Sequence, residues 1–584
     1  MAKNPLSKRQ QYEIVRAQLE SERATFLPHW RDLGDYILPR RPRFFTSDVN
    51  KGDKRNQRII DGTATLSART LRAGMMGGVT SPARPWFRLS TNDPSLAEYP
   101  SVKEWLDAVS RKMATIFLRS NLYNVLPIIY GDIGTFGTAS MLIQEDFEDV
   151  VRFYPFPIGS YSIGNDHRLK VGVFTRDFKM TVRQLVEQFG RKNPKTGAAD
   201  WSNFSTQVKN AYDQSQYETW IEVIHMVQPN MEFDRNKLMS KYKKFASCYY
   251  ESGMSSGTSA NYMAGSASEE QFLRESGYDF FPVLCPRWEV TGEDVYGTDC
   301  PGMSALGDIK SLQVMQRRKS QAIEKMVNPP MVGPTSLRTT KTTILPGDIT
   351  YSDEREGQKG FRPAHEVNIR IGELTADIQD HQQRIRRAYF EDLFLMLANS
   401  DRRDITAREI DERHEEKLLA LGPVLEQLNQ DLLDPLIDNT FDIMLRQGQV
   451  PPPPEELQGV QLKVEYISVM AQAQKLVGIS SIERFAGFAN QVAVVAPESL
   501  DKLDVDQMLD VYADATSMPP GIVRSDEQVA SIRDARAKQQ KAAQAAENAK
   551  NMASGARDLS QANMEGDNAL TRMIEGANAG NLVQ

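Results

Sequence analysis

The sequence predicts an α+β fold, and three successive regions of the chain support this prediction. Apolar residues recur at helical spacing between about residues 7 and 118. Between about 135 and 300 the apolar period shifts toward two, which is typical of strands joined by short turns. Beyond residue 300 long amphipathic helical patterns return. A strand-rich region between two helical regions indicates an α+β protein.

The N-terminal region is predicted to contain three helices and one strand. The first spans 7–38 and starts with a capping box, in which Ser7 and Gln10 satisfy each other's backbone N–H groups. Pro28 is expected to kink or split this helix, because proline cannot donate a backbone hydrogen bond. A basic loop follows, then a helix from about 61 to 76. The segment 81–87 turns the chain into a strand, and the third helix covers 100–118.

The central region begins with a predicted β-hairpin. Its strands cover 138–143 and 150–156, and its turn contains Glu145, Asp146, Glu148 and Asp149. Four acidic residues so close together could bind a metal ion, but a solvated hairpin tip is the favoured interpretation. Further strands are predicted at 171–178, 220–227, 241–250 and 281–283. Thr181 and Gln184 form a second capping box, which predicts a short helix between two of these strands.

Two long helices are predicted after residue 300. The first covers 304–327 and ends at Asn328-Pro329-Pro330, because proline cannot continue a helix. The second spans 367–398, roughly 45 Å at 1.5 Å per residue. His381 lies on its apolar seam and is interpreted as a packed histidine at a helix interface. Between the helices lies an insertion rich in Pro, Gly and Thr, with one strand-like piece at 342–345.

The C-terminal third starts at a charged break, residues 399–404. A capping box formed by Thr406 and Glu409 then starts a third long helix, and Gly422-Pro423 is expected to kink it. A rigid proline spacer occupies 451–454, a strand is predicted at 462–469, and shorter helices extend to about 523. The Ala- and Gln-rich tail, 531–584, is interpreted as either a solvated helix or a disordered segment.

Composition and motifs argue against several classes of protein. The chain has 584 residues, a net charge of −7 and three cysteines, so neither a basic DNA-coating protein nor a disulfide scaffold is indicated. It contains no GxxxxGK[ST] phosphate loop and no HExxH zinc motif. One GxSxG match, 253–257, falls in a Gly/Ser-rich stretch that reads as a loop rather than a nucleophile elbow. No secretory signal or membrane-spanning run is visible. We therefore expect a protein without catalytic activity, cofactor or metal.

The order of the segments resembles that of bacteriophage portal proteins, specifically the head-to-tail connecting proteins of short-tailed, T7-like phages. Two long helices flank a compact insertion, and a short charged break and a kinked helix follow. The segments that carry the resemblance are spread over about 30–475, and none of them is a catalytic motif. They are 71–82, 84–87, 134–139, 406–410 with Glu415 and 421–423, and 464–468 with Ala471 and Gln472.

The resemblance implies a portal-type fold with a mixed α/β wing, a long-helix stem, a small clip insertion and a helical C-terminal crown. Mapped onto this chain, the implied regions are a wing (1–303), a stem helix (304–327), a clip (328–365), a second stem helix (366–398), a tunnel loop (399–405), a kinked wing helix with a strand (406–469), a crown (470–530) and a tail (531–584).

The resemblance also implies a function and a set of partners. Portal proteins form a ring, here expected to be a homododecamer, at one vertex of the capsid in the virion. Double-stranded DNA is packaged and ejected through the ring without sequence specificity. A terminase and later tail adaptor proteins dock on the clip, and capsid and scaffolding proteins surround the ring. The protein would be made in the host cytoplasm, with no membrane partner.

Candidate site residues lie in the tunnel loop and the clip. Arg402 and Arg403 are the candidate contacts to DNA phosphates in the channel. Arginine is always charged and can form two parallel hydrogen bonds to one phosphate. They could instead pair with Asp401 and Asp404 and neutralise the turn. The candidate docking residues of the clip form a polar, partly basic rim. They are Arg338, Lys341, Lys359 and Arg362.

Two other functions stay open at this point. A tail adaptor or an internal virion protein would suit the same setting, although adaptors are usually much shorter. A DNA-processing hydrolase such as a terminase nuclease would need a phosphate loop or clustered acidic metal ligands. The sequence lacks the first and offers only Glu145–Asp149 for the second.

Overall fold

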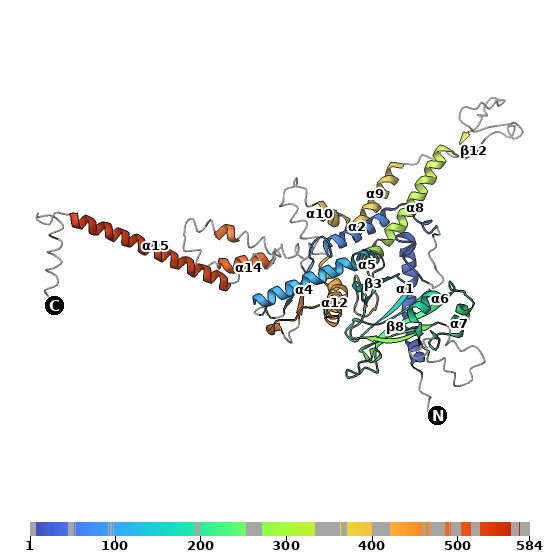
Figure 1. Cartoon of the computed structure of the whole chain (residues 1–584). Helices are drawn as coiled ribbons and strands as arrows, with labels where there is room; N and C mark the ends of the chain where they lie inside the picture. Colours follow the sequence, from blue (N-terminus) through green and yellow to red (C-terminus); the bar gives the residue numbers. More distant parts are fainter. Residues whose placement is uncertain are drawn as a thin grey trace, which may run out of the picture.

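The computed structural model has an α+β architecture, as predicted. A body of helices and antiparallel sheets carries a projecting helical pair, which includes α8, and a single long helix, α15, extends away on another side (Figure 1). The described residues are 7–44, 52, 54–91, 93, 96, 99–192, 199–252, 271–332, 362–363, 371–399, 421–457, 462–466, 485–489, 491, 504–515, 526–561 and 572. None of the described helices is both long enough and apolar enough to cross a bilayer.

Four N-terminal helices contribute to the main hydrophobic core of the body. They are α1 (Lys8–Tyr36), α2 (Thr63–Gly78), α4 (Pro100–Arg119) and α5 (Leu122–Phe136). The capping box of Ser7 and Gln10 starts α1 as predicted. Of the two expectations for Pro28, the split is wrong, since α1 runs unbroken through this residue.

Helix α5 was not predicted from the sequence, although it is the most buried of the four. Eleven of its residues are buried, and Val125, Ile129 and Ile133 belong to the main hydrophobic core. A helix that is buried on most sides carries apolar residues nearly all around it, so its sequence shows little helical period. Pro127 and the two glycines at 131 and 134 further weaken the helical signal.

A five-stranded antiparallel sheet forms the far side of the body. Its strands, in spatial order, are β10 (Arg274–Tyr278), β9 (Phe245–Glu251), β8 (Trp220–Pro229), β5 (Val171–Thr181) and β4 (Tyr161–Asn165). The capping box of Thr181 and Gln184 starts α6 (Val182–Phe189), as predicted. Together with α7 (Thr206–Asp213), α6 covers one face of the sheet and shares a second hydrophobic cluster with it. Strands β6 (Arg191–Lys192) and β7 (Ala199–Asp200) pair with each other in a separate two-stranded sheet.

The predicted β-hairpin is confirmed. Strands β2 (Ser140–Asp146) and β3 (Val150–Phe156) pair directly, and β11 (Val283–Leu284) adds a third strand. In the acidic turn, Asp146 Oδ1 accepts a hydrogen bond from the backbone N–H of Glu148 at 2.8 Å, and Arg152 forms an ion pair with Asp146 at 3.0 Å. Within the described part of the chain, no group of three or more His, Cys, Asp or Glu side chains is placed to hold a metal ion.

Two strands that are distant in sequence pair with each other and connect the two ends of the body. Strand β1 (Phe87–Thr91) pairs antiparallel with β14 (Leu462–Tyr466), so that Phe87 lies opposite Tyr466. The N-terminal helices are thus joined to a segment almost four hundred residues later in the chain. The strand predicted at 462–469 is confirmed over 462–466.

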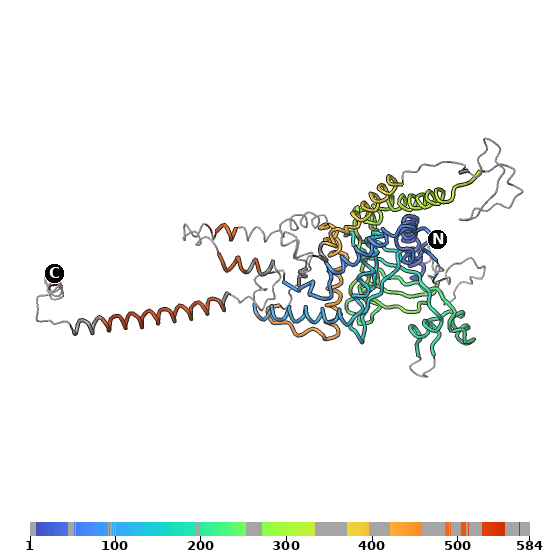
Figure 2. Tube along the Cα trace, turned by 90° about the horizontal axis from the view of Figure 1, so that it is seen from above, coloured from blue at the N-terminus to red at the C-terminus, as the bar shows by residue number. Residues whose placement is uncertain are grey.

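The helices after residue 300 form a projecting pair. Helix α8 (Pro301–Val327) packs against α9 (Ile371–Ala388), and Asn328 ends α8 as predicted. At the outer end of α8, β12 (Met331–Val332) pairs with β13 (Arg362–Pro363). The turned view in Figure 2 shows the pair extending past the edge of the body.

The prediction of one continuous helix over 367–398 is wrong. The chain forms α9 and a separate helix α10 (Glu391–Asn399), with Tyr389 and Phe390 between them. Phe390 has a φ of 54°, a left-handed conformation that ends α9. Neither residue is a glycine or proline, so the sequence carried no sign of this break.

The C-terminal elements include an irregular helix and two exposed helices. Residues 421–428 are helical and continue through a π-helical turn, η4 (Asn429–Leu433), into α12 (Asp434–Arg446). A short 3-10 turn, η5 (Glu455–Leu457), follows the proline spacer. Helix α14 (Val505–Ala515) is joined to α15 (Asp526–Gln561) by an ion pair between Asp506 and Arg533 at 2.6 Å. Of the two interpretations of the tail, the helix is confirmed over the described range.

Candidate functional site

Helix α8 has an inner half inside the body and an outer half that projects from it. Ala305, Ile309 and Leu312 on the inner half are buried in the main core. On the outer half, Ile323, Met326 and Val327 are exposed, although α9 packs alongside. Exposed apolar side chains gathered on a projecting helix are typical of surfaces that contact another molecule.

A cluster of hydrogen bonds around Asp61 connects the projecting pair of helices to the body. Gln316 on α8 and Gln382 on α9 both donate to Asp61 Oδ2, at 2.9 and 2.8 Å. The side-chain oxygen of Gln313 accepts from the backbone N–H of Asp61 at 2.8 Å. Burial alone would raise the pKa of Asp61, but hydrogen bonds from Thr63, Gln382 and Gln316 favour the carboxylate and hold the pKa below its usual value.

His381 lies at the interface between the two projecting helices, as interpreted from the sequence. Its Nδ1 is 2.8 Å from Asp308 Oδ1 on α8. Arg384, one turn further along α9, is 3.4 Å from the same oxygen and also pairs with Asp380. The pair is therefore held by buried apolar contacts near the body and by ionic contacts along its flank.

The short helix α10 packs on α2 at a close approach between Gly74 and Phe394. A Cβ atom at position 74 would overlap the ring of Phe394, so only glycine allows this packing. Ser67 Oγ on α2 also donates to Glu391 Oε2 at 2.7 Å. These contacts position the first half of α10, the helix that leads to the predicted tunnel loop.

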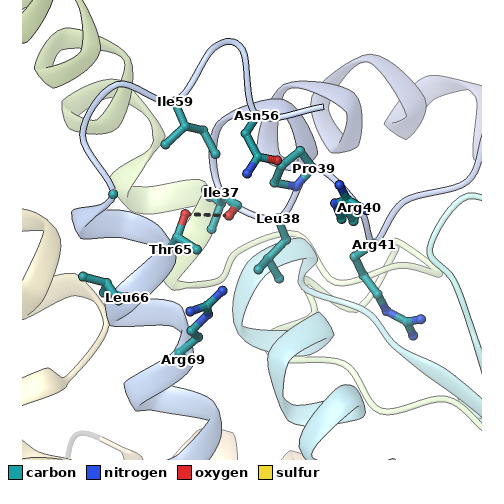
Figure 3. A pocket seen from close by; sticks show the side chains of 11 residues that line it. Ile37, Leu38, Pro39, Arg40, Arg41, Asn56, Ile59, Thr65, Leu66 and Arg69 are labelled. Atoms are coloured by element: carbon teal, nitrogen blue, oxygen red, sulfur yellow. Dashed lines mark hydrogen bonds between the residues drawn. The ribbon is translucent and has the colours of Figure 1, made fainter. Parts of the chain in front are cut away.

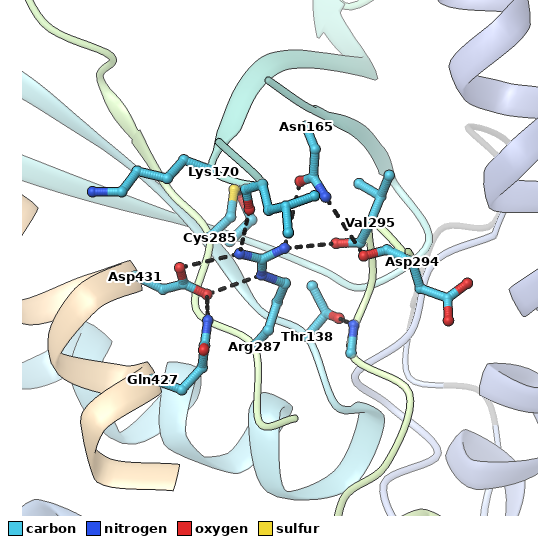
Figure 4. Close-up of polar contacts among 12 residues, drawn as sticks. Thr138, Asn165, Lys170, Cys285, Arg287, Asp294, Val295, Gln427 and Asp431 are labelled. Atoms are coloured by element: carbon cyan, nitrogen blue, oxygen red, sulfur yellow. Dashed lines mark hydrogen bonds and ion pairs between the residues drawn. The ribbon is translucent and has the colours of Figure 1, made fainter. Parts of the chain in front are cut away.

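A buried ion pair joins the β-rich side of the body to the irregular helix (Figure 4). Arg287 Nε is 2.9 Å from Asp431 Oδ2, and both side chains are almost fully buried. Arg287 also donates to the backbone carbonyl of Leu169 at 3.1 Å, and Gln427 donates to Asp431 at 2.8 Å. Asp431 lies inside the π-helical turn η4, a type of irregularity often found at functional positions.

A pocket of about 640 Å³ lies between the end of α1 and the start of α2 (Figure 3). Its lining is mainly apolar and includes Ile37, Leu38 and Ile59, together with Arg69. Arg41 also lines it, but its guanidinium reaches away to Asp132 at 2.7 Å. The basic loop predicted after α1 therefore contributes at least one structural arginine.

Most of the site residues expected from the sequence lie outside the described residues. These are Arg402 and Arg403 of the tunnel loop, and Arg338, Lys341 and Lys359 of the clip. Arg362 is described through its backbone, which pairs with Val332. The GxSxG segment at 253–257 also lies outside the described part.

The hydrogen-bond cluster at Asp61 and the buried ion pair at Arg287 were not identified from the sequence. Each is formed by residues more than one hundred positions apart, and no short motif marks such pairs. The only local signal is the position of Asp61 just before a helix, where its carboxylate accepts from the backbone N–H of Thr63.

Comparison with known proteins gives one family and two close relatives. The family model "Bacteriophage head to tail connecting protein" matches residues 9–523. A "Portal protein" of Salmonella phage epsilon15 is 49% identical over 563 residues, covering 96% of this chain and 97% of the relative. A "Probable portal protein" of Bordetella phage BPP-1 is 43% identical over 554 residues, covering 95% and 96% respectively.

Proposed function

Because this chain belongs to the family of bacteriophage head-to-tail connecting proteins and has a portal function in DNA packaging, we propose that it forms a closed ring of twelve copies at one capsid vertex. Double-stranded DNA passes through this ring during packaging and ejection, without sequence-specific contacts. A terminase docks first and tail adaptors replace it, while capsid and scaffolding proteins surround the ring. The role is structural, and no step of it requires catalysis, a cofactor or a metal.

The observation that carries the ring proposal is the exposed outer half of α8. Ile323, Met326 and Val327 offer apolar surface that the single chain leaves open to water. Burying such surface contributes about 25 cal/mol per Å², so contact with a neighbouring copy stabilises the assembly. A head-to-tail contact of this kind closes into a ring when the rotation between copies allows it.

The proposed regions keep the boundaries expected from the sequence, with one adjustment in the second stem. The wing is 1–303, the first stem helix 304–327 and the clip 328–365. The second stem, 366–398, consists of α9 and α10 rather than one helix. The tunnel loop, 399–405, follows α10, and the kinked wing helix with its strand (406–469), the crown (470–530) and the tail (531–584) complete the chain.

The pairing of β12 with β13 supports assignment of the clip. Val332 and Arg362 lie opposite each other, so both ends of the insertion meet at the outer end of α8. An insertion closed in this way at the tip of a rigid helix is well placed for docking. Arg338, Lys341, Lys359 and Arg362 are the proposed contacts to the terminase and the adaptors.

The position of α10 supports the assignment of the tunnel loop. Its packing on α2 through Phe394 fixes the helix that leads into residues 399–405. Arg402 and Arg403 are the proposed contacts to DNA phosphates. Weak phosphate contacts repeated around a ring hold DNA against slipping, yet each is easily broken as DNA advances.

Electron microscopy of the purified chain tests the proposal. The expected image is a closed ring with a central hole, and mass measurement should give twelve copies. A stable monomer at micromolar concentration in assembly buffer would contradict the ring. A ring of another size would contradict only the subunit number.

A further inference from the structure

A small pocket of about 190 Å³ lies where the turn between β3 and β4 meets β5. Its lining combines two arginines, Arg43 and Arg176, with the side chains of tyrosine, phenylalanine and proline residues. The pocket is smaller than those that hold drug-sized molecules. It has room, however, for a single ion several times larger than a water molecule.

The guanidinium group of Arg176 lies between two aromatic rings at this pocket. Its Cζ atom is 4.3 Å from the centre of the Phe156 ring and 4.2 Å from the centre of the Phe178 ring. Both rings line the pocket, so the guanidinium group lies at its wall. The Nε atom of Arg176 is buried and has no hydrogen-bond partner among the described residues. The aromatic faces attract a cation, but they supply no negative charge.

No carboxylate that the structure describes forms an ion pair with Arg43 or Arg176. Asp177 also lines the pocket, but Arg16 binds both of its carboxylate oxygens, at 3.1 and 2.8 Å. Burial lowers the pKa of Arg176, and the phenol of Tyr249 on β9 offsets this effect only in part. A cation withdrawn from water is costly unless a counter-charge accompanies it. The pocket therefore has two positive charges for which the described residues supply no counter-charge.

The backbone fixes both arginines at the pocket. The backbone N–H of Arg43 donates to the carbonyl of Ile158 in the turn at 3.0 Å. Gly159 has a φ of 86°, and a Cβ atom there would lie 2.8 Å from the carbonyl oxygen of Arg43. Glycine at this position thus allows the segment after α1 to lie against the turn. Arg176 is held by the sheet, where it lies opposite Tyr161 on β4.

We propose that this pocket binds a phosphate group carrying two negative charges, held between the guanidinium groups of Arg43 and Arg176. Guanidinium groups bind phosphate oxygens through charge-assisted hydrogen bonds, and the fixed position of Arg176 reduces the entropy lost on binding. A dianion neutralises both arginines, whereas a carboxylate leaves one positive charge uncompensated. The bound ion links the segment after α1, the β3–β4 turn and β5, so it stabilises the body. This inference goes beyond the proposed function and does not depend on the ring.

Calorimetric titration and thermal unfolding of the full chain test the inference at pH 8. Sodium phosphate is compared with sodium chloride and sodium acetate at equal ionic strength. The site variants are Arg176→Gln and Arg43→Gln. The matched control is Arg168→Gln, which removes the same charge from an exposed position in the turn between β4 and β5.

The wild type should bind phosphate with a Kd of about 1 mM or lower, the range that charge-assisted contacts from two arginines support. Its midpoint of thermal unfolding should rise with phosphate concentration, because the ligand binds only the folded chain. Each site variant should bind phosphate at least about tenfold more weakly. The control should bind like the wild type. Arg43 is only partly buried, so Arg43→Gln keeps the test valid even where Arg176→Gln does not fold.

Three results would overturn the inference. Equal phosphate affinity of the site variants and the control would show an adventitious ion only. Acetate binding as tightly as phosphate would contradict the requirement for two negative charges. Duplex DNA that binds through these arginines, while free phosphate does not, would make the pocket a DNA contact.

A further titration with a nucleoside 5′-monophosphate distinguishes the sources of the phosphate group. Weaker binding than that of free phosphate would support the inorganic ion, in accord with the small volume of the pocket. Tighter binding that still depends on Arg43 and Arg176 would support the same phosphate site and assign it to a nucleotide.

Discussion

Arg287 and Asp431, 144 positions apart in the chain, form a bidentate ion pair in the interior of the body. Arg287 Nε and Nη2 reach the two carboxylate oxygens at 2.9 and 3.2 Å. The pair connects the strand-rich side of the body to the π-helical turn in the helix leading into α12. If this helix moves relative to the sheets, the ion pair must either break or move together with both of its residues.

Replacing Asp431 by Asn should destabilise the protein strongly. The substitution leaves the buried guanidinium of Arg287 without a counter-charge, which typically costs about 3–5 kcal/mol. Urea unfolding followed by circular dichroism measures the effect. Glu218→Gln is the matched control, because the pair of Glu218 with Arg183 is exposed and should change stability by less than about 1 kcal/mol. Equal changes in the free energy of unfolding for the two substitutions would show that the buried pair stabilises the protein no more than the exposed pair does.

Asp438 should make stability depend on pH. Asp438 is exposed on α12, but partial desolvation of its carboxylate, together with repulsion from Asp434 and Asp442 one turn away on either side, raises its pKa to about 6. Its usual value is about 3.9 in an unfolded chain, so the folded state binds the proton more tightly. Ionisation therefore lowers stability as pH rises from about 4 through 6.

The variant Asp438→Asn cannot ionise and should escape this loss. At pH 7.5 it should be more stable than the wild type by about 0.5–1 kcal/mol, a small value because water screens the side chain. At pH 4 the two proteins should be equally stable. Unfolding curves at both pH values measure the difference, and a gain of the same size at pH 4 would rule out this electrostatic origin.

The exposed face of α8 should be required for assembly. Ile323→Asp with Met326→Asp places charge where the proposed ring buries apolar surface. The variant should keep the circular dichroism spectrum of the wild type but remain monomeric by mass photometry. Leu118→Asp on α4 is an exposed control that should still assemble. Normal rings from the α8 variant would remove the main support for the ring interface.

The close approach of α10 to α2 should tolerate no side chain at position 74. Gly74→Ala forces Phe394 to move and should cost about 1–3 kcal/mol. Gly77→Ala is the matched control on the same helix, because no described atom lies within 4 Å of its Cβ position. It should be neutral or stabilise by up to about 1 kcal/mol through helix propensity. Unfolding measurements that rank the two substitutions in the reverse order would contradict the packing argument.

The proposed tunnel loop should matter for DNA rather than for assembly. Arg402→Gln with Arg403→Gln should leave rings intact but reduce the amount of DNA packaged or retained. The defect should shrink as salt rises, because the contacts are electrostatic. Packaging assays at low and high salt measure this. Full-length DNA retained normally at low salt would show that the two arginines only neutralise Asp401 and Asp404.

Local signals made many elements predictable from the sequence. The capping boxes at Ser7 and Thr181 mark helix starts that the structure confirms, and Asn328 marks the end of α8. Features that depend on tertiary packing were missed. Helix α5 is buried on most sides, so its apolar residues show little helical period, and the break at Phe390 occurs without glycine or proline because α10 turns to pack on α2.

The site residues expected from the sequence in the tunnel loop and in most of the clip lie outside the described residues, so they stay predictions. The histidine at position 381 was identified correctly as an interface residue, since its spacing matched the apolar seam of α9. Its partner Asp308 could not be predicted, and neither could the pairing of Arg287 with Asp431. Such contacts depend on how distant elements pack, and sequence spacing carries no information about them.

Helix α15 has the length and exposure of a lever arm. Its 36 residues span about 54 Å at 1.5 Å per residue, and its described side chains are almost all exposed. The ion pair of Arg533 with Asp506 lies near its first turns, which makes this end the pivot. A rotation of about 10° at the pivot moves the far end by roughly 9 Å, given this length. Small changes of angle near the contact with α14 would therefore become large displacements at the other end of α15.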